Sequence, residues 1–197
     1  ENAKPDYDRM VKFLGELAQD GEPVMLFGTA VGFFDFLDYC DAGQIRFELP
    51  RRSRLMETGG SKGRKRKISK TDLYKRFEMT LGLDPVFCIN EYGMTEMGSQ
   101  FYDTALRDHL FGEAGEVEKL GPAWVKTRVV NPMTGADVEY GREGILCHMD
   151  LANVCSVLAL ETEDLGIRTK RGFDIIGRVP AGEPRGCSLA SEEKLSI

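Results

Sequence analysis

Residues 86–96 read VFCINEYGMTE. The first four residues form a short, continuous apolar run, which is typical of a buried β-strand. The residues after it place an aromatic ring, a glycine, a hydroxyl and a carboxylate within the five positions from Tyr92 to Glu96. Because ligands of open α/β sheets bind beyond the carboxyl ends of the strands, we predict a ligand-binding loop here. From composition alone, a polar surface turn is an equal alternative.

Helix and strand patterns alternate on both sides of this stretch. Asp6 is suited to cap a helix, and Gly21 is suited to end it. Ser69 begins a capping-box pattern ahead of another apolar stripe, which ends before Gly82. We also expect a helix over 29–39 and short strands over 23–27, 53–58 and 86–89. This alternation favours an α/β fold with a parallel sheet.

The pattern changes after about residue 100. Strands are expected over 124–130, 144–148, 157–162 and 173–176, with turns between them, and no helix signal remains. We therefore expect an α/β portion over residues 1–100. A β-rich portion over 101–197, forming an antiparallel sheet or a partial barrel, is expected to follow it.

Length and composition exclude several classes of protein. The 197 residues, 42% of them hydrophobic, suffice for one domain or two small ones. The longest mostly apolar stretch, residues 24–34, is shorter than the roughly 18 residues that indicate a membrane span, and no signal peptide is visible. The five cysteines include no C-x-x-C pair, so we expect reduced thiols in a cytoplasmic protein. Because the sequence begins at Glu1 rather than Met, we expect a piece of a longer protein.

Charge is concentrated in one window of an acidic chain. The formal net charge is −6, yet residues 51–76 hold eleven basic and only two acidic residues. Within this window, Gly59 to Gly63 would let backbone N–H groups approach a phosphate closely, and the cations after it would add positive charge. The alternative to an anion-binding loop is a solvated surface loop without a ligand. A single basic run without interleaved aromatic residues argues against a nucleic-acid partner.

The same glycine-rich segment fits G-x-S-x-G, the nucleophile-elbow pattern of serine hydrolases. Ser61 would be the nucleophile and His148 or His109 the base. An elbow leads directly into a packed helix, whereas a basic run without an apolar face follows here. His148 also adjoins Cys147 in an expected strand, where neighbours point to opposite faces and form no dyad. We therefore expect both histidines to be structural.

Two later stretches are further candidates. Residues 161–166 read ETEDLG, and their three carboxylates are suited to ribose hydroxyls or a metal ion, although a hairpin with a solvated tip is the more common meaning of such a pattern. Cys187 follows Arg185 and Gly186, and a nearby cation lowers the pKa of a thiol. A plain exposed thiol is the alternative there.

Taken together, these stretches resemble a known family. Tyr92 to Glu96 resembles the Y-G-x-T-E signature of adenylate-forming enzymes, which activate carboxylic acids with ATP. Thr58-Gly59-Gly60 lies upstream, where that superfamily has a glycine-rich segment, and Asp164 and Arg178 follow in the order of its ribose-binding residues. The longer strings ETGGSKGR, NEYGMTE with QFYD, and RGCSL are similar to the LuxE-type acyl-protein synthetases, also called long-chain-fatty-acid–luciferin-component ligases.

The resemblance implies the N-terminal domain fold of an adenylate-forming enzyme and a two-step reaction that uses ATP and Mg²⁺. A fatty acid would form acyl-AMP and pyrophosphate, and the acyl group would then pass to a thiol. By matching position, the resemblance implies that Gly59 and Gly60 form a shelf, that Tyr92, which precedes Gly93 of the signature, stacks on adenine, and that Thr95 bonds the α-phosphate. It implies that Glu96 holds Mg²⁺. It also implies that Asp164 binds the ribose hydroxyls and that Arg178 contacts the ribose or a phosphate. Cys187 is the candidate acyl acceptor, and a reductase or another acyl-accepting protein is a possible partner.

The sequence departs from the family pattern in three places. The phosphate loop that ends in Lys is missing and should lie before Glu1. The usual T-G-D is Thr162-Glu163-Asp164, and the C-terminal subdomain with its catalytic Lys is absent, since Lys194 stands in a polar tail. We therefore expect weak nucleotide binding and little turnover by this chain alone. An acyl-CoA ligase of the phenylacetate-CoA ligase type is the nearest alternative, because the adenylation residues are shared.

Overall fold

The computed structural model describes residues 5–59 and 69–179. The chain divides into two compact units between Pro122 and Ala123. The α/β elements precede the β-rich elements along the chain, as the sequence predicts. Within the described ranges, no helix has both the length and the apolar character needed to cross a membrane.

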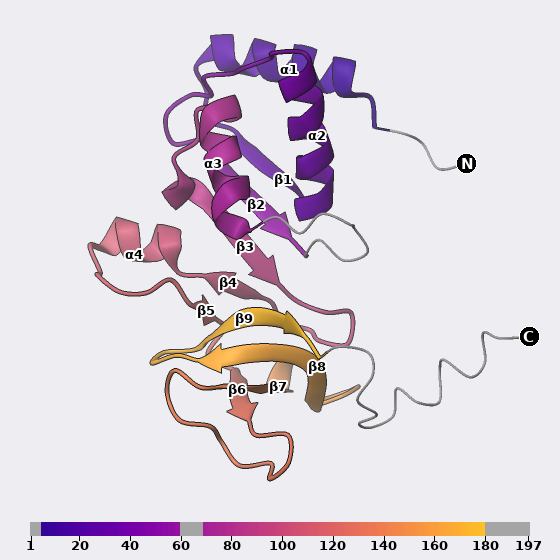
Figure 1. Ribbon diagram of the computed structural model, residues 1–197, viewed down its shortest axis with the longest axis vertical. Coiled ribbons are helices and arrows are strands. Elements are labelled where there is room, and N and C mark those ends of the chain that lie inside the picture. The colour runs from indigo at the N-terminus through magenta and orange to yellow at the C-terminus, as the bar shows by residue number, and fades with distance from the viewer. Residues whose placement is uncertain (1–4, 60–68, 180–197) are drawn as a thin grey trace, which may run out of the picture. The chain divides into compact units, whose positions relative to one another are not determined.

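Three parallel strands organise the first unit (Figure 1). β1 (Met25–Thr29), β2 (Arg54–Thr58) and β3 (Cys88–Tyr92) pair in this order, which confirms the predicted α/β layer. Two short strands, β4 (Phe101–Asp103) and β5 (Lys119–Leu120), continue this sheet in antiparallel orientation. The helices of the unit are α1 (Tyr7–Asp20), α2 (Ala30–Ala42), α3 (Lys70–Leu81), the 3₁₀ turn η1 (Pro85–Phe87) and α4 (Ala105–Phe111).

Local capping chemistry sets the ends of the predicted helices. Asp6 caps α1 and Ser69 caps α3, each side chain accepting a first-turn backbone N–H, at 2.9 Å and 3.1 Å respectively. Gly21 and Gly82 follow the two helices with φ values of 76° and 68°. Only glycine adopts this left-handed conformation without a steric penalty, so both helices end where the sequence predicts.

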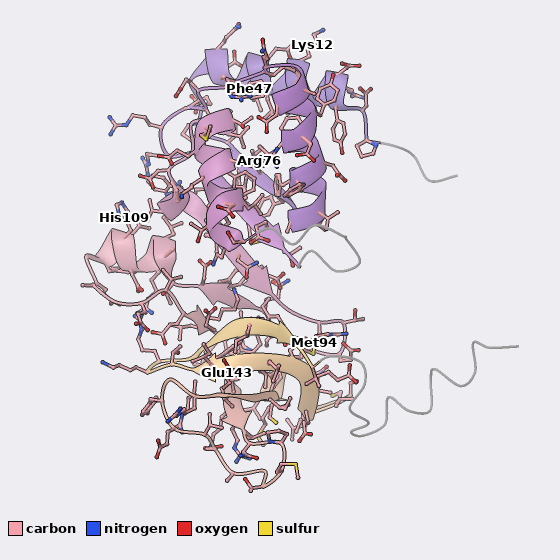
Figure 2. All side chains as sticks on the ribbon, viewed as in Figure 1. Lys12, Phe47, Arg76, Met94, His109 and Glu143 are labelled. Carbon is pink, nitrogen blue, oxygen red and sulfur yellow. The ribbon has the colours of Figure 1, made fainter. Side chains whose placement is uncertain are left out.

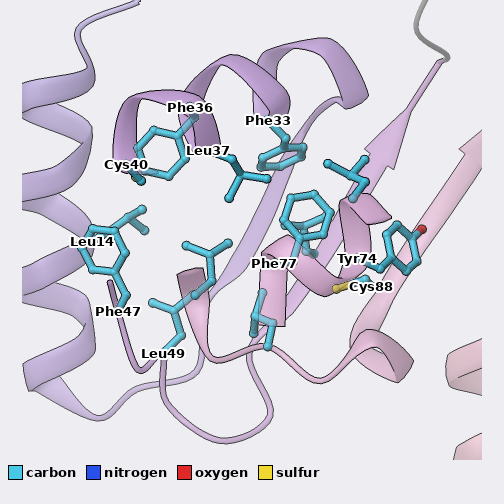
Figure 3. Close-up of a cluster of buried hydrophobic side chains, with 14 residues drawn as sticks. Leu14, Phe33, Phe36, Leu37, Cys40, Phe47, Leu49, Tyr74, Phe77 and Cys88 are labelled. Carbon is cyan, nitrogen blue, oxygen red and sulfur yellow. The ribbon is translucent and has the colours of Figure 1, made fainter. Parts of the chain in front are cut away.

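The core of the first unit lies between the helices and the parallel sheet (Figure 3). Phe36, Leu37, Phe77 and Leu81 are at most 1% exposed. Each such side chain contributes roughly 1.5–3 kcal/mol on burial, so this cluster is the main source of stability in the unit. The other members of the cluster are Leu14, Phe33, Cys40, Phe47, Leu49, Leu55, Leu73, Tyr74, Leu83 and Cys88.

Arg76, a member of the basic window, joins α3 to α2 (Figure 2). Its guanidinium donates to Asp38 at 2.8 Å and to Asp41 at 2.7 Å. It also lies over the ring of Phe34, 4.9 Å from the centroid. This cation is therefore used within the fold, so not all of the window's positive charge is available to an anionic ligand.

The second unit contains an antiparallel sheet with the strand order β9-β8-β7-β6. Its strands are β6 (Val125–Val130), β7 (Glu143–Asp150), β8 (Ala159–Arg168) and β9 (Phe173–Arg178), with a 3₁₀ turn η2 (Leu151–Asn153) after β7. Bulges interrupt the β7–β8 and β8–β9 registers. Val129, Val130, Ile145, Leu146 and Phe173 are its buried apolar residues.

The structure differs from the sequence prediction at several points. The expected absence of helices after residue 100 is wrong, because α4 forms there; Leu110 and Phe111 are 61% and 74% exposed, so this helix has no continuous buried stripe to detect. β3 begins at Cys88 and continues through Tyr92, so residues 86–87 of the predicted strand lie in η1 and the predicted strand end at residue 89 is three residues too early. Residues 161–166 lie within β8 and not at a hairpin tip.

Candidate functional site

The parallel register brings the two glycine-containing motifs to the same edge of the sheet. Thr58 lies opposite Glu91 at the ends of β2 and β3, and Gly59 and Tyr92 come next in their strands' sequences. Gly59 has a φ of 76°, so the chain leaves β2 through a left-handed residue that favours glycine. This edge is the carboxyl end of the parallel strands, where ligands of open α/β sheets bind.

A side-chain contact ties the two motifs together. Thr58 Oγ1 donates a hydrogen bond to Glu91 Oε2, and Glu91 is only 6% exposed. A Cβ atom at Gly93 would lie 2.5 Å from Glu91 Oε1. Gly93 therefore leaves room for the glutamate that connects the end of β3 to the end of β2.

The residues after β3 present their polar groups to solvent. Tyr92 is half-buried, and its ring lies 5.8 Å from that of Phe101 at a tilt of 38°. A turn follows, closed by a hydrogen bond from Met97 N to Met94 O at 3.1 Å, and Figure 2 marks Met94. Thr95 and Glu96 are the exposed central residues of this turn. A hydroxyl donor and a carboxylate thus stand beside the aromatic ring at the sheet edge.

Buried polar side chains lie behind this edge, on the side of α3. Glu57 Oε1 accepts hydrogen bonds from Asn90 Nδ2 at 2.8 Å and from the Tyr74 hydroxyl at 3.3 Å. Asp103 Oδ2 accepts from Lys70 Nζ at 2.6 Å and from Asn90 N at 2.9 Å. Burial raises the pKa of Glu57, although the bond from Asn90 and the nearby lysines act in the opposite direction. Burial likewise raises the pKa of Tyr74.

Sequence analysis did not identify this buried cluster. Its local signal is Glu57, a charged residue at an inward-facing position of β2, where the strand alternates between buried and half-buried residues. Asn90 lies on β3 and Lys70 on α3, so no single short motif contains all members of the cluster.

The expected ribose-binding residues form an ion pair in the second unit. Asp164 of β8 lies directly opposite Arg178 of β9, and its Oδ1 accepts a hydrogen bond from Arg178 Nε at 2.9 Å. Asp164 is 8% exposed, whereas the Arg178 side chain is 53% exposed. Thr162 Oγ1 accepts from Asp164 N at 3.0 Å and donates to Leu146 O at 2.9 Å. In this Thr162-Glu163-Asp164 sequence, the threonine side chain thus holds the backbone of the aspartate.

The predicted site residues therefore fall into three sets. Gly59, Tyr92, Gly93, Thr95 and Glu96 gather at the sheet edge of the first unit. Asp164 and Arg178 are paired in the second unit. Gly60, Ser61 and Cys187 lie outside the described residues.

The two histidines lie in different environments, His148 buried and His109 exposed. His148 is 2% exposed, and its Nδ1 lies 3.0 Å from Thr127 Oγ1. Burial lowers the pKa of His148 to about 4, while Asp164 and Asp150 partly oppose that shift. His109 is exposed on α4, with its ring 5.7 Å from that of Phe87.

The metal expectation rests on Glu96 alone. Among residues 5–59 and 69–179, no group of three or more His, Cys, Asp or Glu side chains could hold a metal ion. Mg²⁺ that accompanies a nucleotide needs only one or two carboxylates beside phosphate oxygens and water. The exposed Glu96 carboxylate fits that requirement.

Comparison with known proteins agrees with this geometry. The sequence matches the family described as "Acyl-protein synthetase, LuxE" over residues 3–196. The chain belongs to the LuxE family. No curated protein matches the LuxE-family chain.

The fold is that of adenylate-forming enzymes, as three solved structures illustrate. An open conformation of 2-hydroxyisobutyryl-CoA ligase with 2-HIB-AMP and CoA is 17% identical, with a TM-score of 0.64 over 94% of this chain and 42% of that one. ATP-bound MatB from Rhodopseudomonas palustris is 18% identical, with a TM-score of 0.57 over 89% and 33%. A long-chain-fatty-acid-CoA ligase from Archaeoglobus fulgidus is 11% identical, with a TM-score of 0.60 over 89% and 37%. The LuxE-family chain spans less than half the length of each.

Proposed function

We propose that this LuxE-family chain is the nucleotide-binding part of an enzyme that activates a fatty carboxylic acid with ATP and transfers the acyl group to a thiol. The observation that carries the proposal is the register of β2 and β3, which sets Gly59 beside the Tyr92 segment at the carboxyl edge of the sheet. Family membership and the fold of adenylate-forming enzymes support the same reaction class.

The chemistry needs positioning and charge stabilisation more than bond-making groups on the protein. A carboxylate oxygen of the acid attacks the α-phosphorus of ATP, and the bond to the β-phosphate oxygen breaks to release pyrophosphate. A thiolate then attacks the acyl carbon, and AMP leaves with the electron pair of the C–O bond. The thiolate is the acceptor because it is a strong nucleophile near neutral pH.

The residues of the chain take the following roles in this proposal. The ring of Tyr92 stacks on adenine, and the Thr95 hydroxyl donates a hydrogen bond to the α-phosphate. Asp164, kept in place by Arg178, accepts hydrogen bonds from the ribose hydroxyls. Glu96 holds Mg²⁺, which supplies positive charge next to the phosphates when bound. Cys187 accepts the acyl group.

The aromatic role is tested by nucleotide affinity. We expect Tyr92→Ala to raise the Kd for ATP about tenfold, which corresponds to about 1.4 kcal/mol of base stacking. Tyr92→Phe retains the ring, so its Kd should stay within twofold of the parent chain. Isothermal titration calorimetry of both variants measures this difference. Equal Kd values for the Ala variant and the parent chain contradict the proposed site.

The acceptor is tested with a radiolabelled fatty acid, ATP and Mg²⁺. We expect a protein-bound label that hydroxylamine releases and that Cys187→Ser abolishes, while the matched change at the exposed Cys155, Cys155→Ser, retains it. Formation of acyl-CoA without a labelled protein favours the CoA ligase alternative instead.

A further inference from the structure

We infer that Glu57, Asp103 and Lys119 are positioning residues that hold Asn90 and thereby orient the ring of Tyr92 for a nucleotide. The ligand half of this inference rests on the proposed function. Glu57 begins the string ETGGSKGR and Asp103 ends the string QFYD, yet none of the three side chains is among the residues expected to touch ATP. We call these three residues and Asn90 the strand-end clamp.

The clamp contacts three hydrogen-bonding groups of Asn90. Its backbone N–H donates to Asp103 Oδ2 at 2.9 Å, and its backbone carbonyl accepts from Lys119 Nζ at 3.1 Å. Its side-chain amide donates to Glu57 Oε1 at 2.8 Å. The three partners come from β4, β5 and β2, so separate elements fix one residue from three directions.

Because these groups are buried, their contacts are strong, and the loss of one partner destabilises the protein. Glu57, Asp103 and Lys119 are 3%, 6% and 3% exposed. Hydrogen bonds of charged groups contribute about twice as much as neutral ones, and a buried charge left without its partner costs several kcal/mol. Lys70, whose side chain is 45% exposed, also bonds Asp103 and adds a second positive charge at the edge of this region.

The backbone ladder holds the end of β3 through Glu91 on the β2 side, but it offers little on the β4 side. Its neighbour β4 has three residues, and β5 beyond it has two. Only Glu91 and Tyr92 of β3 are in register with β4. Such short strands contribute few ladder hydrogen bonds, so on this side the clamp adds the contacts that hold the end of β3.

The link from Asn90 to Tyr92 follows from strand geometry. Residues two apart in a strand point to the same face, so the Asn90 amide and the Tyr92 ring share one side of the sheet. A rotation of the backbone at Asn90 therefore changes the orientation of the Tyr92 ring. Freeing Asn90 should leave Tyr92 in place but spread its ring over several orientations, which lowers affinity for a stacked base.

Two substitutions that remove charges of opposite sign distinguish the positioning role from a direct electrostatic effect on ATP. Glu57→Leu removes a negative charge, which by itself would strengthen the binding of anionic ATP, and Lys119→Met removes a positive charge, which would weaken it. The clamp predicts the same result for both, a Kd for ATP that rises three- to tenfold. It also predicts a similar rise with adenosine, which is uncharged.

Controls separate positioning from loss of stability. Glu57→Gln retains the Oε1 acceptor and should keep the Kd within twofold of the parent chain. Leu14→Ala removes a core side chain on α1. It should lower Tm while leaving the Kd at 10 °C within twofold. The amide proton of Asn90 adds a direct readout, because its hydrogen exchange should accelerate at least tenfold in Glu57→Leu and Lys119→Met but not in Glu57→Gln.

The possible outcomes are distinct. Unchanged Kd values for both ligands in Glu57→Leu and Lys119→Met, with a lowered Tm, overturn the positioning role and leave the residues structural. Opposite shifts of the two Kd values for ATP, with no change for adenosine, overturn it in favour of electrostatics. If the parent chain binds neither ATP nor adenosine, the proposed function fails and the ligand half of the inference fails with it. The exchange of the Asn90 amide proton then still decides whether the clamp holds the strand end.

Discussion

Asp164 and Arg178 face each other across β8 and β9, with 2.9 Å between Asp164 Oδ1 and Arg178 Nε. The acid is buried, whereas the arginine is about half exposed at the last position of its strand. A cross-strand pair of this kind fixes the direction of the carboxylate while leaving the cation accessible. The two residues therefore act as one unit, in which the arginine orients the acid that we propose for ribose binding.

Removal of Asp164 should weaken nucleotide binding through the sugar. We expect Asp164→Ala to raise the Kd for ATP about tenfold, because hydrogen bonds to a charged acceptor contribute about 1.5–3 kcal/mol. With 2′,3′-dideoxy-ATP, which lacks both hydroxyls, the same substitution should change the Kd less than twofold. Calorimetric titration of both nucleotides measures the coupling. Asp174→Ala, at an exposed position of β9, is the matched control and should bind ATP like the parent chain.

Gly166 sets the β8–β9 register next to that pair. A Cβ atom here would lie 2.6 Å from Leu146 Cδ2 and 2.8 Å from the backbone oxygen of Asp174. Because that backbone cannot yield as a flexible side chain can, we expect Gly166→Ala to lower the free energy of unfolding by about 1–3 kcal/mol. Chemical denaturation measures it. Gly15→Ala, within α1 and with no atom inside 4 Å of its Cβ, should instead stabilise the protein by about 0.5–1 kcal/mol.

Three helices of the first unit, α1, α2 and α3, could be predicted because their signals are local. The cap Ser69 and the end residue Gly82 directly flank the apolar stripe of α3, so residues close together in the sequence suffice to predict both ends of the helix. The seven-residue α4 escaped prediction, since its apolar residues Leu110 and Phe111 remain exposed and mark no buried face.

The site was predictable in its motifs but not in what supports them. The order of Asp164 and Arg178 was available by resemblance, whereas their direct pairing depends on a register that two bulged strands set only on folding. Glu57 and Asn90 are 33 residues apart in sequence, and Asn90 and Lys119 are 29 apart. Contacts at such separations follow from strand order and not from any local pattern, so the strand-end clamp could be identified only from the structure.

The described cysteines should differ sharply in reactivity. Burial raises the pKa of Cys40 to about 11 and that of Cys88 to about 12, so neither forms a reactive thiolate near neutral pH. Cys155 is exposed. We therefore expect iodoacetamide at pH 7.5 to modify Cys155 within minutes and to leave Cys40 and Cys88 unmodified until the protein unfolds, as peptide mass spectrometry would show. Rapid modification of Cys88 in the native protein would contradict its burial in the core of the first unit.

Protonation of His148 should make stability depend on pH. The folded pKa of about 4, caused first by burial, lies below the roughly 6.5 of an unfolded histidine. Above pH 6.5 the residue is neutral in both states and has no pH-dependent effect. As the pH falls from 6.5 to 4, the unfolded state binds a proton that the folded state does not, so stability decreases, by roughly 3 kcal/mol in total from this residue.

The comparison of two variants isolates this contribution from that of the carboxylates, which titrate in the same range. We expect the loss of unfolding free energy between pH 7.5 and pH 4.5 to be smaller in His148→Gln than in the parent chain, since glutamine takes up no proton. His109→Gln changes an exposed histidine and should follow the parent curve. Urea unfolding at a series of pH values gives all three curves. Parallel curves for His148→Gln and the parent chain would mean that His148 binds its proton equally well in both states, which its burial against Phe173, with ring centroids 5.6 Å apart, should prevent.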